Sequence, residues 1–242
     1  CVDAKVRGYE SSMQSYLFPD QMPVSGYHNL IDSVHEGLPV LMKYFQLKKQ
    51  ELHLDEIHIY DLYVDLVKEN NQEYAFEEAK EMVLNAMSVL GEDYVRRLKE
   101  AFTNRWIDVY PNKGKQKGAY SGGGYDTPPY VLLNYMGTID DVSALAHELG
   151  HAMHSYYTKE NNPYITGDHS TFVGEVASTV NELFLAKYLL KTTEDKNLKK
   201  SILVHLMDMF KSTIYRQVMF AEFEEQIHSA VEKGEVLTSE SI

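Results

Sequence analysis

His147-Glu148-Leu149-Gly150-His151 is the stretch that decides what kind of fold this chain needs. Residues four apart on an α-helix lie above one another on one face, so both histidines can direct their imidazoles at the same cation. Glu148 follows the first histidine and can reach a water molecule at an open position of that cation. Two histidines, one carboxylate and an open position are typical of catalytic zinc. The stretch therefore predicts a helix with two metal ligands, His147 and His151, and a general base, Glu148.

A third ligand should come from a separate helix packed against the first. Four residues lie at a suitable distance downstream: Asp168, His169, Glu175 and Glu182. The first two follow a glycine in a predicted loop, which would hold a ligand less firmly. Glu175 lies one turn into the next predicted helix, beside Val173 and Val176. A charge in such an apolar stripe is costly unless it has a partner, so we expect Glu175 to be the third metal ligand.

Two further polar residues lie near this predicted face. Glu182 is two turns along from Glu175. It could orient a histidine ligand through a hydrogen bond or belong to the solvated face, and the sequence favours neither. His154 follows His151 by three residues, and we interpret it as a core or surface histidine rather than a ligand.

The composition is that of an ordinary globular protein, with 44% hydrophobic and 24% charged residues among 242. No run of eighteen apolar residues predicts a transmembrane helix. The net charge of −13 disfavours nucleic acid and membranes as partners, because both are held by basic patches. Cys1 is the single cysteine and excludes an internal disulfide, which fits a reducing, cytoplasmic location. The sequence gives no oligomeric state.

Helical periodicity dominates the chain and predicts a mostly α fold. The apolar spacing predicts helices over residues 25–47, 74–90, 92–104, 138–157 and 171–189, and one long or two joined helices over 197–231. The buried face of the first helix is expected to consist of Leu30, Val34, Leu38, Leu41 and Phe45. Residues 54–67 are ambiguous. Thr138 or Asp140 is expected to cap the helix that carries the histidines.

Glycine, proline, tyrosine and serine cluster between residues 117 and 135. Glycines followed by residues that favour β structure predict a small β-hairpin or edge strand, and an irregular loop fits as well. No internal repeat or linker is evident. We therefore expect a single catalytic-core region over residues 1–242.

Several segments together resemble the oligoendopeptidase F branch of the thimet-oligopeptidase-like zinc metallopeptidases. These segments are residues 58–63, 117–123, 147–157, 172–182 and 215–224. The resemblance implies a helical zincin-type catalytic domain that hydrolyses short peptides. It assigns one zinc ion per chain to His147, His151 and Glu175, and the role of catalytic base to Glu148.

The same resemblance carries two further expectations. The strand at residues 118–121 would pair with the backbone of a peptide substrate. Members of the family extend beyond both ends of this chain, so we expect a catalytic-core fragment of a longer peptidase, and activity of the fragment alone is in question.

Two other interpretations start from the same residues. Glu148 and His151 form one Glu-x-x-His pair, and Glu225 and His228 form a second. Two such pairs, together with a Glu from each of two further helices, can hold a di-iron carboxylate site in a four-helix bundle, although His147 would then have no role. Alternatively, the chain is a non-catalytic helical scaffold. Metal analysis separates the three: about one zinc, two irons or no metal per chain.

Overall fold

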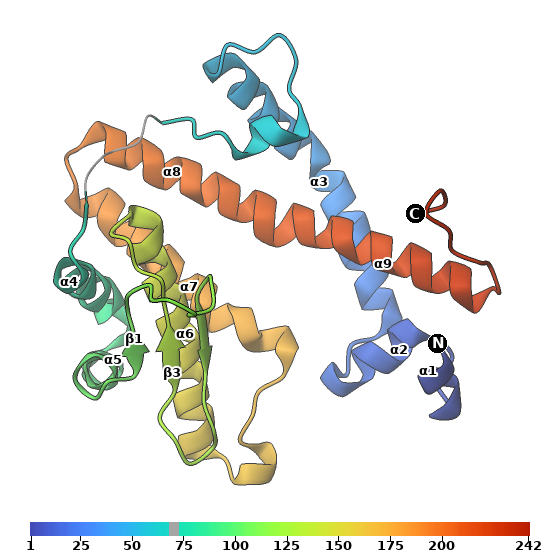
Figure 1. Ribbon diagram of the computed structural model, residues 1–242, viewed down its shortest axis with the longest axis horizontal. Helices are drawn as coiled ribbons and strands as arrows, with labels where there is room; N and C mark the ends of the chain where they lie inside the picture. The colour runs from blue at the N-terminus through green and yellow to red at the C-terminus, as the bar shows by residue number, and fades with distance from the viewer. Residues whose placement is uncertain (68–72) are drawn as a thin grey trace. The chain divides into compact units, whose positions relative to one another are not determined.

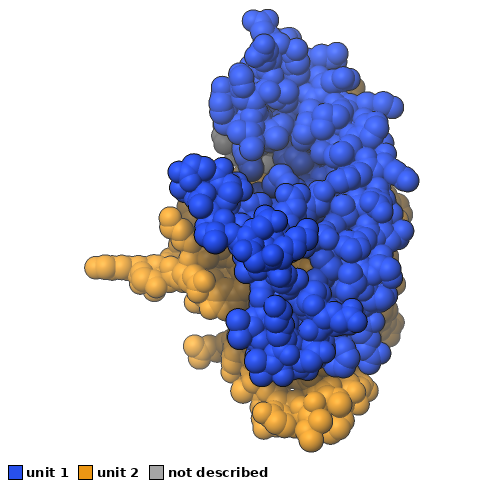
Figure 2. Space-filling view, turned by 90° about the vertical axis from the view of Figure 1, so that its right-hand side faces the viewer, with its two compact units in different colours: residues 1–68, 203–242 blue, residues 69–202 orange. Residues whose placement is uncertain are grey.

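The computed structural model describes residues 1–67 and 73–242, which form two compact units (Figure 2). The first unit comprises residues 1–68 and 203–242, and the second comprises residues 69–202. Both are built mainly from helices (Figure 1), so the mostly α prediction is confirmed. The division into units does not decide whether they form one catalytic core, so the single-region expectation stays a prediction.

The regular elements of the first unit are all helical in its described part. Its elements are α1 (Val2–Val6), α2 (Ser12–Leu17), a 3-10 turn at Phe18–Asp20, α3 (Val24–Glu51), a 3-10 turn at Ile59–Tyr63, the larger part of α8 (Lys196–Phe210), a π-helical turn at Lys211–Tyr215 and α9 (Arg216–Glu232). The long α3 continues past Pro39, and the ambiguous residues 54–67 contain only the second 3-10 turn. The predicted long helix at the C-terminal end is therefore present, with a π-helical turn inside it.

The buried face of α3 differs from the predicted one. Ile31 and Val34 pack with Val218 of α9, whereas Leu30 and Leu38 of the predicted stripe are exposed. The helical period was right, but the stripe was centred about one residue away from the face that α9 covers. A period read from one helix fixes which residues share a face, and the packing partner decides which face is buried.

The second unit combines four helices, the start of a fifth and a small sheet. Its elements are α4 (Phe76–Ala86) with a 3-10 turn at Met87–Leu90, α5 (Glu92–Thr103), β1 (Ile107–Asp108), β2 (Tyr120–Gly122), β3 (Tyr130–Leu132), α6 (Ile139–Asn161), a 3-10 turn at Tyr164–Thr166, α7 (Thr171–Thr192) and the start of α8 (Lys196–Phe210). The strand order is β1-β3-β2. β2 and β3 are antiparallel, which confirms the predicted hairpin. β1 pairs parallel to β3 and was missed, because two residues are too short to show an alternating pattern.

The core of the second unit lies around α6, which packs against α7, β2 and β3. The inner face of α6 is formed by residues that are at most 1% exposed: Val142, Leu145, Leu149, Ala152 and Met153. These residues recur at helical spacing, so burial of this stripe fixes the rotation of α6. Within the described part of the chain, no helix has the length and apolar character needed to cross a membrane.

Candidate metal centre

The start of α6 sets the position of the two histidines. Thr138, one of the two predicted caps, accepts a hydrogen bond from the backbone N–H of Asp141 at 3.1 Å. The Asp141 carboxylate in turn accepts one from the Thr138 N–H at 2.9 Å. This reciprocal capping box satisfies two backbone donors that the first turn would otherwise leave free. The helix then continues without a break through His147 and His151.

Gly150, between the two histidines, is a point of close backbone approach between α6 and α7. A Cβ atom at this position would lie 2.6 Å from Ser178 Cα and 2.7 Å from the Ala177 carbonyl oxygen. Only glycine permits such an approach of two backbones. The buried Asn181 also joins the helices, because its amide donates to the Ala146 carbonyl at 3.2 Å. The two helices are therefore held together one turn away from Glu175.

Three of the predicted residues, His147, His151 and Glu175, converge as a result of this packing. The two histidine Nε2 atoms are 3.1 Å apart. Glu175 Oε2 lies 3.4 Å from Nε2 of His147 and 3.3 Å from Nε2 of His151. Zinc bonded at about 2.0–2.1 Å in a tetrahedron holds neighbouring ligand atoms about 3.3 Å apart. The three atoms therefore already have the spacing that a tetrahedral ion requires.

A hydrogen bond on the far side of the His147 ring shows which of its nitrogens is the acceptor. His147 Nδ1 lies 2.6 Å from Glu182 Oε1. A carboxylate only accepts, so Nδ1 carries the proton and the neutral ring has a lone pair on Nε2. A hydrogen bond with the Gly174 backbone raises the pKa of His151 but does not outweigh burial. Of the two interpretations of Glu182, the structure shows the hydrogen bond to a histidine, and Ser143 donates to Glu182 at 3.0 Å.

The electrostatic surroundings of the two histidines differ. Burial lowers the pKa of His147, but the hydrogen bond to Glu182 and the nearby carboxylates outweigh burial, so this pKa lies above its usual value. The pKa of His151 is lowered, chiefly by burial, and Glu175 only partly offsets this. The carboxylates of Glu148, Glu175 and Glu182 thus favour a positive charge on the His147 ring.

Glu148 is buried, with 6% of its surface exposed. Its Oε2 atom has no hydrogen-bond partner among the residues that the structure describes. Burial raises its pKa from 4.5 to about 7; His147 opposes this rise, and Glu175 and Glu182 add to it. A buried carboxylate oxygen without a partner is costly, and this one is available to accept a proton.

The surroundings of Glu175 differ from the prediction. Its side chain is 68% exposed, and Val173 and Val176 are also exposed, so this turn of α7 is not a buried apolar stripe. The prediction failed because α6 covers the face of α7 that carries Ser178 instead. A burial cost therefore cannot be the reason why Glu175 faces the histidines.

The other candidate ligands lie outside the cluster. The Asp168 side chain is almost fully exposed. The His169 ring stacks on His154, with ring centres 4.0 Å apart, and this stacking explains His154 better than a ligand role does. The sequence interpretation missed Ser178, Ser143 and Asn181, because serine and asparagine inside a helix carry no signal of what they contact.

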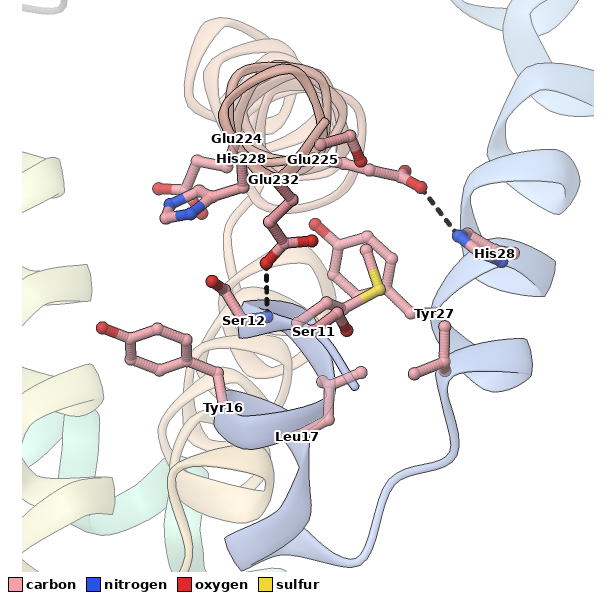
Figure 3. A pocket seen from close by; sticks show the side chains of 13 residues that line it. Ser11, Ser12, Tyr16, Leu17, Tyr27, His28, Glu224, Glu225, His228 and Glu232 are labelled. Atoms are coloured by element: carbon pink, nitrogen blue, oxygen red, sulfur yellow. Dashed lines mark hydrogen bonds and ion pairs between the residues drawn. The ribbon is translucent and has the colours of Figure 1, made fainter. Parts of the chain in front are cut away.

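The second Glu-x-x-His pair lies in the first unit, beside a cavity of about 490 Å³ lined by residues of α2, α3 and α9. Glu225 is 2.7 Å from His28 of α3. Figure 3 shows the Glu225 carboxylate and the His228 ring pointing to different sides of α9. Neither residue belongs to a group of three or more possible metal ligands in the described ranges. The structure therefore gives the di-iron interpretation no support.

Comparison with known proteins finds relatives in both sequence and structure. The sequence profile of peptidase family M3 matches residues 2–242. Oligopeptidase PepF of Bacillus subtilis is 46% identical over 98% of this chain. A crystal structure from Chlamydophila abortus covers 98% of the chain with a TM-score of 0.85 and 43% identity. Oligoendopeptidase-F from Enterococcus faecium covers 98% with a TM-score of 0.67 and 33% identity.

The chain is shorter than these relatives. It spans 35% of the Bacillus subtilis protein, 40% of the Chlamydophila abortus chain and 34% of the Enterococcus faecium chain. Activities of the complete relatives therefore reach this chain only as proposals.

Proposed function

The chain belongs to peptidase family M3, and on this basis we propose that it holds one zinc ion and cleaves short peptides as an endopeptidase. The proposed ligands are His147, His151 and Glu175, and the proposed general base is Glu148.

One observation carries the proposal: three possible metal-ligand atoms converge on one point. Two imidazole nitrogens and a carboxylate oxygen lie 3.1 to 3.4 Å from one another. Acceptors repel at this distance unless a proton or a metal ion lies between them. A set of two histidines and one carboxylate fits zinc and leaves a fourth position open, as in hydrolytic zinc sites.

The residues of this chain supply the proton transfer and the orientation. A bound zinc ion would lower the pKa of an adjacent water molecule to about 7 and polarise the carbonyl of the peptide bond. Glu148 takes the proton from the attacking water and passes it to the leaving amine. Its Oε2 atom is available for this transfer, since no described residue forms a hydrogen bond with it. Glu182 keeps the proton of His147 on Nδ1, so that Nε2 would be available to a bound ion.

The edge strand beside the motif helix is the proposed binding surface for the peptide. In the part of the chain that the structure describes, β2 pairs with β3 on one side only. A peptide in extended conformation can add to such an edge through backbone hydrogen bonds. Because α6 packs against β2, a peptide bound there would lie beside the helix of the proposed ligands. The predicted strand at residues 118–121 overlaps β2 only in part.

No observation favours a di-iron protein or a non-catalytic scaffold over this proposal. The cytoplasmic location stays a prediction, and activity of the chain without the further sequence that its relatives have stays in question.

Metal content and one substitution test the proposal. We expect about one zinc per chain after purification without added metal, and cleavage of a short quenched fluorescent peptide. Glu148→Gln should keep the zinc and lower kcat by about 10²–10⁴-fold, because only the proton acceptor is removed.

The matched control is Glu225→Gln, which changes the same position of the second Glu-x-x-His pair and should leave zinc content and cleavage unchanged. Near-normal cleavage by zinc-loaded Glu148→Gln would contradict the proposed base. Two irons per chain, lost in both variants, would instead support the di-iron alternative.

A further inference from the structure

Ser178 of α7 is completely buried and contacts the third proposed ligand directly. Its Oγ lies 2.7 Å from Glu175 Oε2 and 3.0 Å from the Glu175 carbonyl oxygen. Both of these atoms only accept, so the serine hydroxyl is the donor. A hydrogen bond to a charged carboxylate is stronger than one between neutral groups. The hydroxyl therefore has a preferred direction, toward the Glu175 side chain.

The carboxylate oxygen that Ser178 contacts is the one that faces both histidines. Glu175 Oε2 is the atom 3.4 Å from His147 Nε2 and 3.3 Å from His151 Nε2. The Glu175 side chain is 68% exposed, so packing does little to restrict its torsions. A long exposed side chain samples many rotamers, and a rigid donor at its tip restricts them.

The position of Ser178 is in turn fixed by the helix of the histidines. The close approach of α6 and α7 joins Gly150 to the Cα of Ser178 itself. The hydroxyl that contacts Glu175 is thus only two bonds away from the Cα atom against which α6 packs. Any change in the register of α7 relative to the histidines would move this donor with it.

We infer that Ser178 is a positioning residue of the metal centre, which holds the Glu175 carboxylate in the orientation that completes the three-ligand set. The inference rests on the proposed function. Ser178 would act through Glu175 and would not contact the ion or the substrate.

Zinc affinity of the complete 242-residue chain, measured by competition with a chromophoric chelator, tests the inference. Ser178→Ala should weaken zinc binding by about 10–100-fold, as loss of a hydrogen bond to a ligand does in other zinc sites. The matched control is Thr179→Ala. Thr179 donates to the same Glu175 carbonyl at 2.6 Å but makes no bond with the carboxylate, so its loss should leave zinc affinity unchanged.

A second measurement separates positioning from general loosening of the helix. With Co²⁺ bound in place of zinc, the visible spectrum reports ligand geometry and should change in Ser178→Ala but not in Thr179→Ala. In a Glu175→Gln background, Ser178→Ala should cause no further loss of zinc affinity, because the group it positions is already altered. If the metal-free alanine variant has lost its fold, Ser178→Cys, with its weaker donor, should give an intermediate affinity.

The outcomes distinguish this inference from the proposed function. Wild-type zinc affinity in Ser178→Ala would overturn the inference and leave the proposed metal site standing. Equal losses in the serine and threonine variants, or a full further loss in the Glu175→Gln background, would overturn it as well. If the unsubstituted chain binds no zinc, the proposed function fails and the inference fails with it.

Discussion

Glu148/His151 and Glu225/His228 are two pairs with the same spacing and different surroundings. Glu148 is buried with an unpartnered Oε2, and the His151 ring faces two other acceptors. Glu225 is instead paired with His28 of another helix, and its side chain is 28% exposed. The same Glu-x-x-His spacing therefore accompanies a candidate metal site on α6 and none on α9 among the described residues.

The difference lies in how a second helix meets each pair. α7 approaches α6 backbone to backbone at Gly150 and adds a third acceptor. In the first unit, α3 and α9 meet through apolar side chains and two histidine–glutamate pairs, His28–Glu225 and His35–Glu222. Each of these carboxylates is matched by a histidine across the interface. A metal centre needs at least three ligand atoms directed at one point. Among the described residues, only the second unit provides such a group.

Gly150→Ala should have the largest effect, because it removes the close approach of α6 and α7 that distinguishes the second unit from the first. The added Cβ would meet backbone atoms of α7 at 2.6 to 2.9 Å, so the helices must separate. We expect a loss of about 3 kcal/mol in the free energy of unfolding, the upper end of the range for overpacking, together with loss of zinc binding. Denaturant unfolding and chelator competition measure the two effects.

The matched control is Gly174→Ala in α7. A Cβ at Gly174 has only His169 Nε2 within reach, at 3.9 Å, which is ordinary contact. This variant should be at least as stable as the parent, because alanine favours helix more than glycine does. Equal destabilisation by both substitutions would show that the close approach at Gly150 is not what joins the helices.

Glu182→Gln and Glu225→Gln compare the two histidine–glutamate pairs directly, and we expect smaller effects from them than from Gly150→Ala. Each removes the charge from a carboxylate paired with a histidine, at 2.6 Å and 2.7 Å respectively. We expect Glu182→Gln to weaken zinc binding by about 10–100-fold, since this carboxylate orients a ligand. Glu225→Gln should leave zinc binding unchanged and cost at most about 1 kcal/mol in unfolding free energy, because its pair is partly exposed.

A further prediction concerns the pH dependence of the metal-free protein. The pKa of Glu148 is raised from 4.5 to about 7 by burial, with Glu175 and Glu182 of α7 adding to the shift and His147 opposing it. Between these two values the folded state binds more protons than the unfolded state, so this group makes stability fall as pH rises. One proton gives a slope of at most about 1.4 kcal/mol per pH unit.

Unfolding free energies measured from pH 4.5 to 7 check this expectation. Glu148→Gln should remove the contribution of this group, whereas Glu225→Gln, at the partly exposed pair, should keep it. An unchanged pH dependence in Glu148→Gln would show that Glu148 is not the buried acid responsible.

Local features of the chain were predictable from sequence. The Thr138 cap, the helix through His147 and the hairpin of β2 and β3 all depend on neighbours within a few residues. The two-residue β1 and the buried face of α3 were not predicted, because both depend on pairing with distant segments.

In the candidate site, too, the local features were predictable from sequence and the contacts between distant segments were not. The sequence by itself put His147, Glu148 and His151 on one turn, because helical geometry fixes residues four apart on one face. Only the tertiary structure decided that Glu175 meets them, although it is exposed, and that Glu225 and His228 have no such partner. Convergence of acceptors depends on how closely two backbones pack, and the spacing along a single helix does not contain that distance.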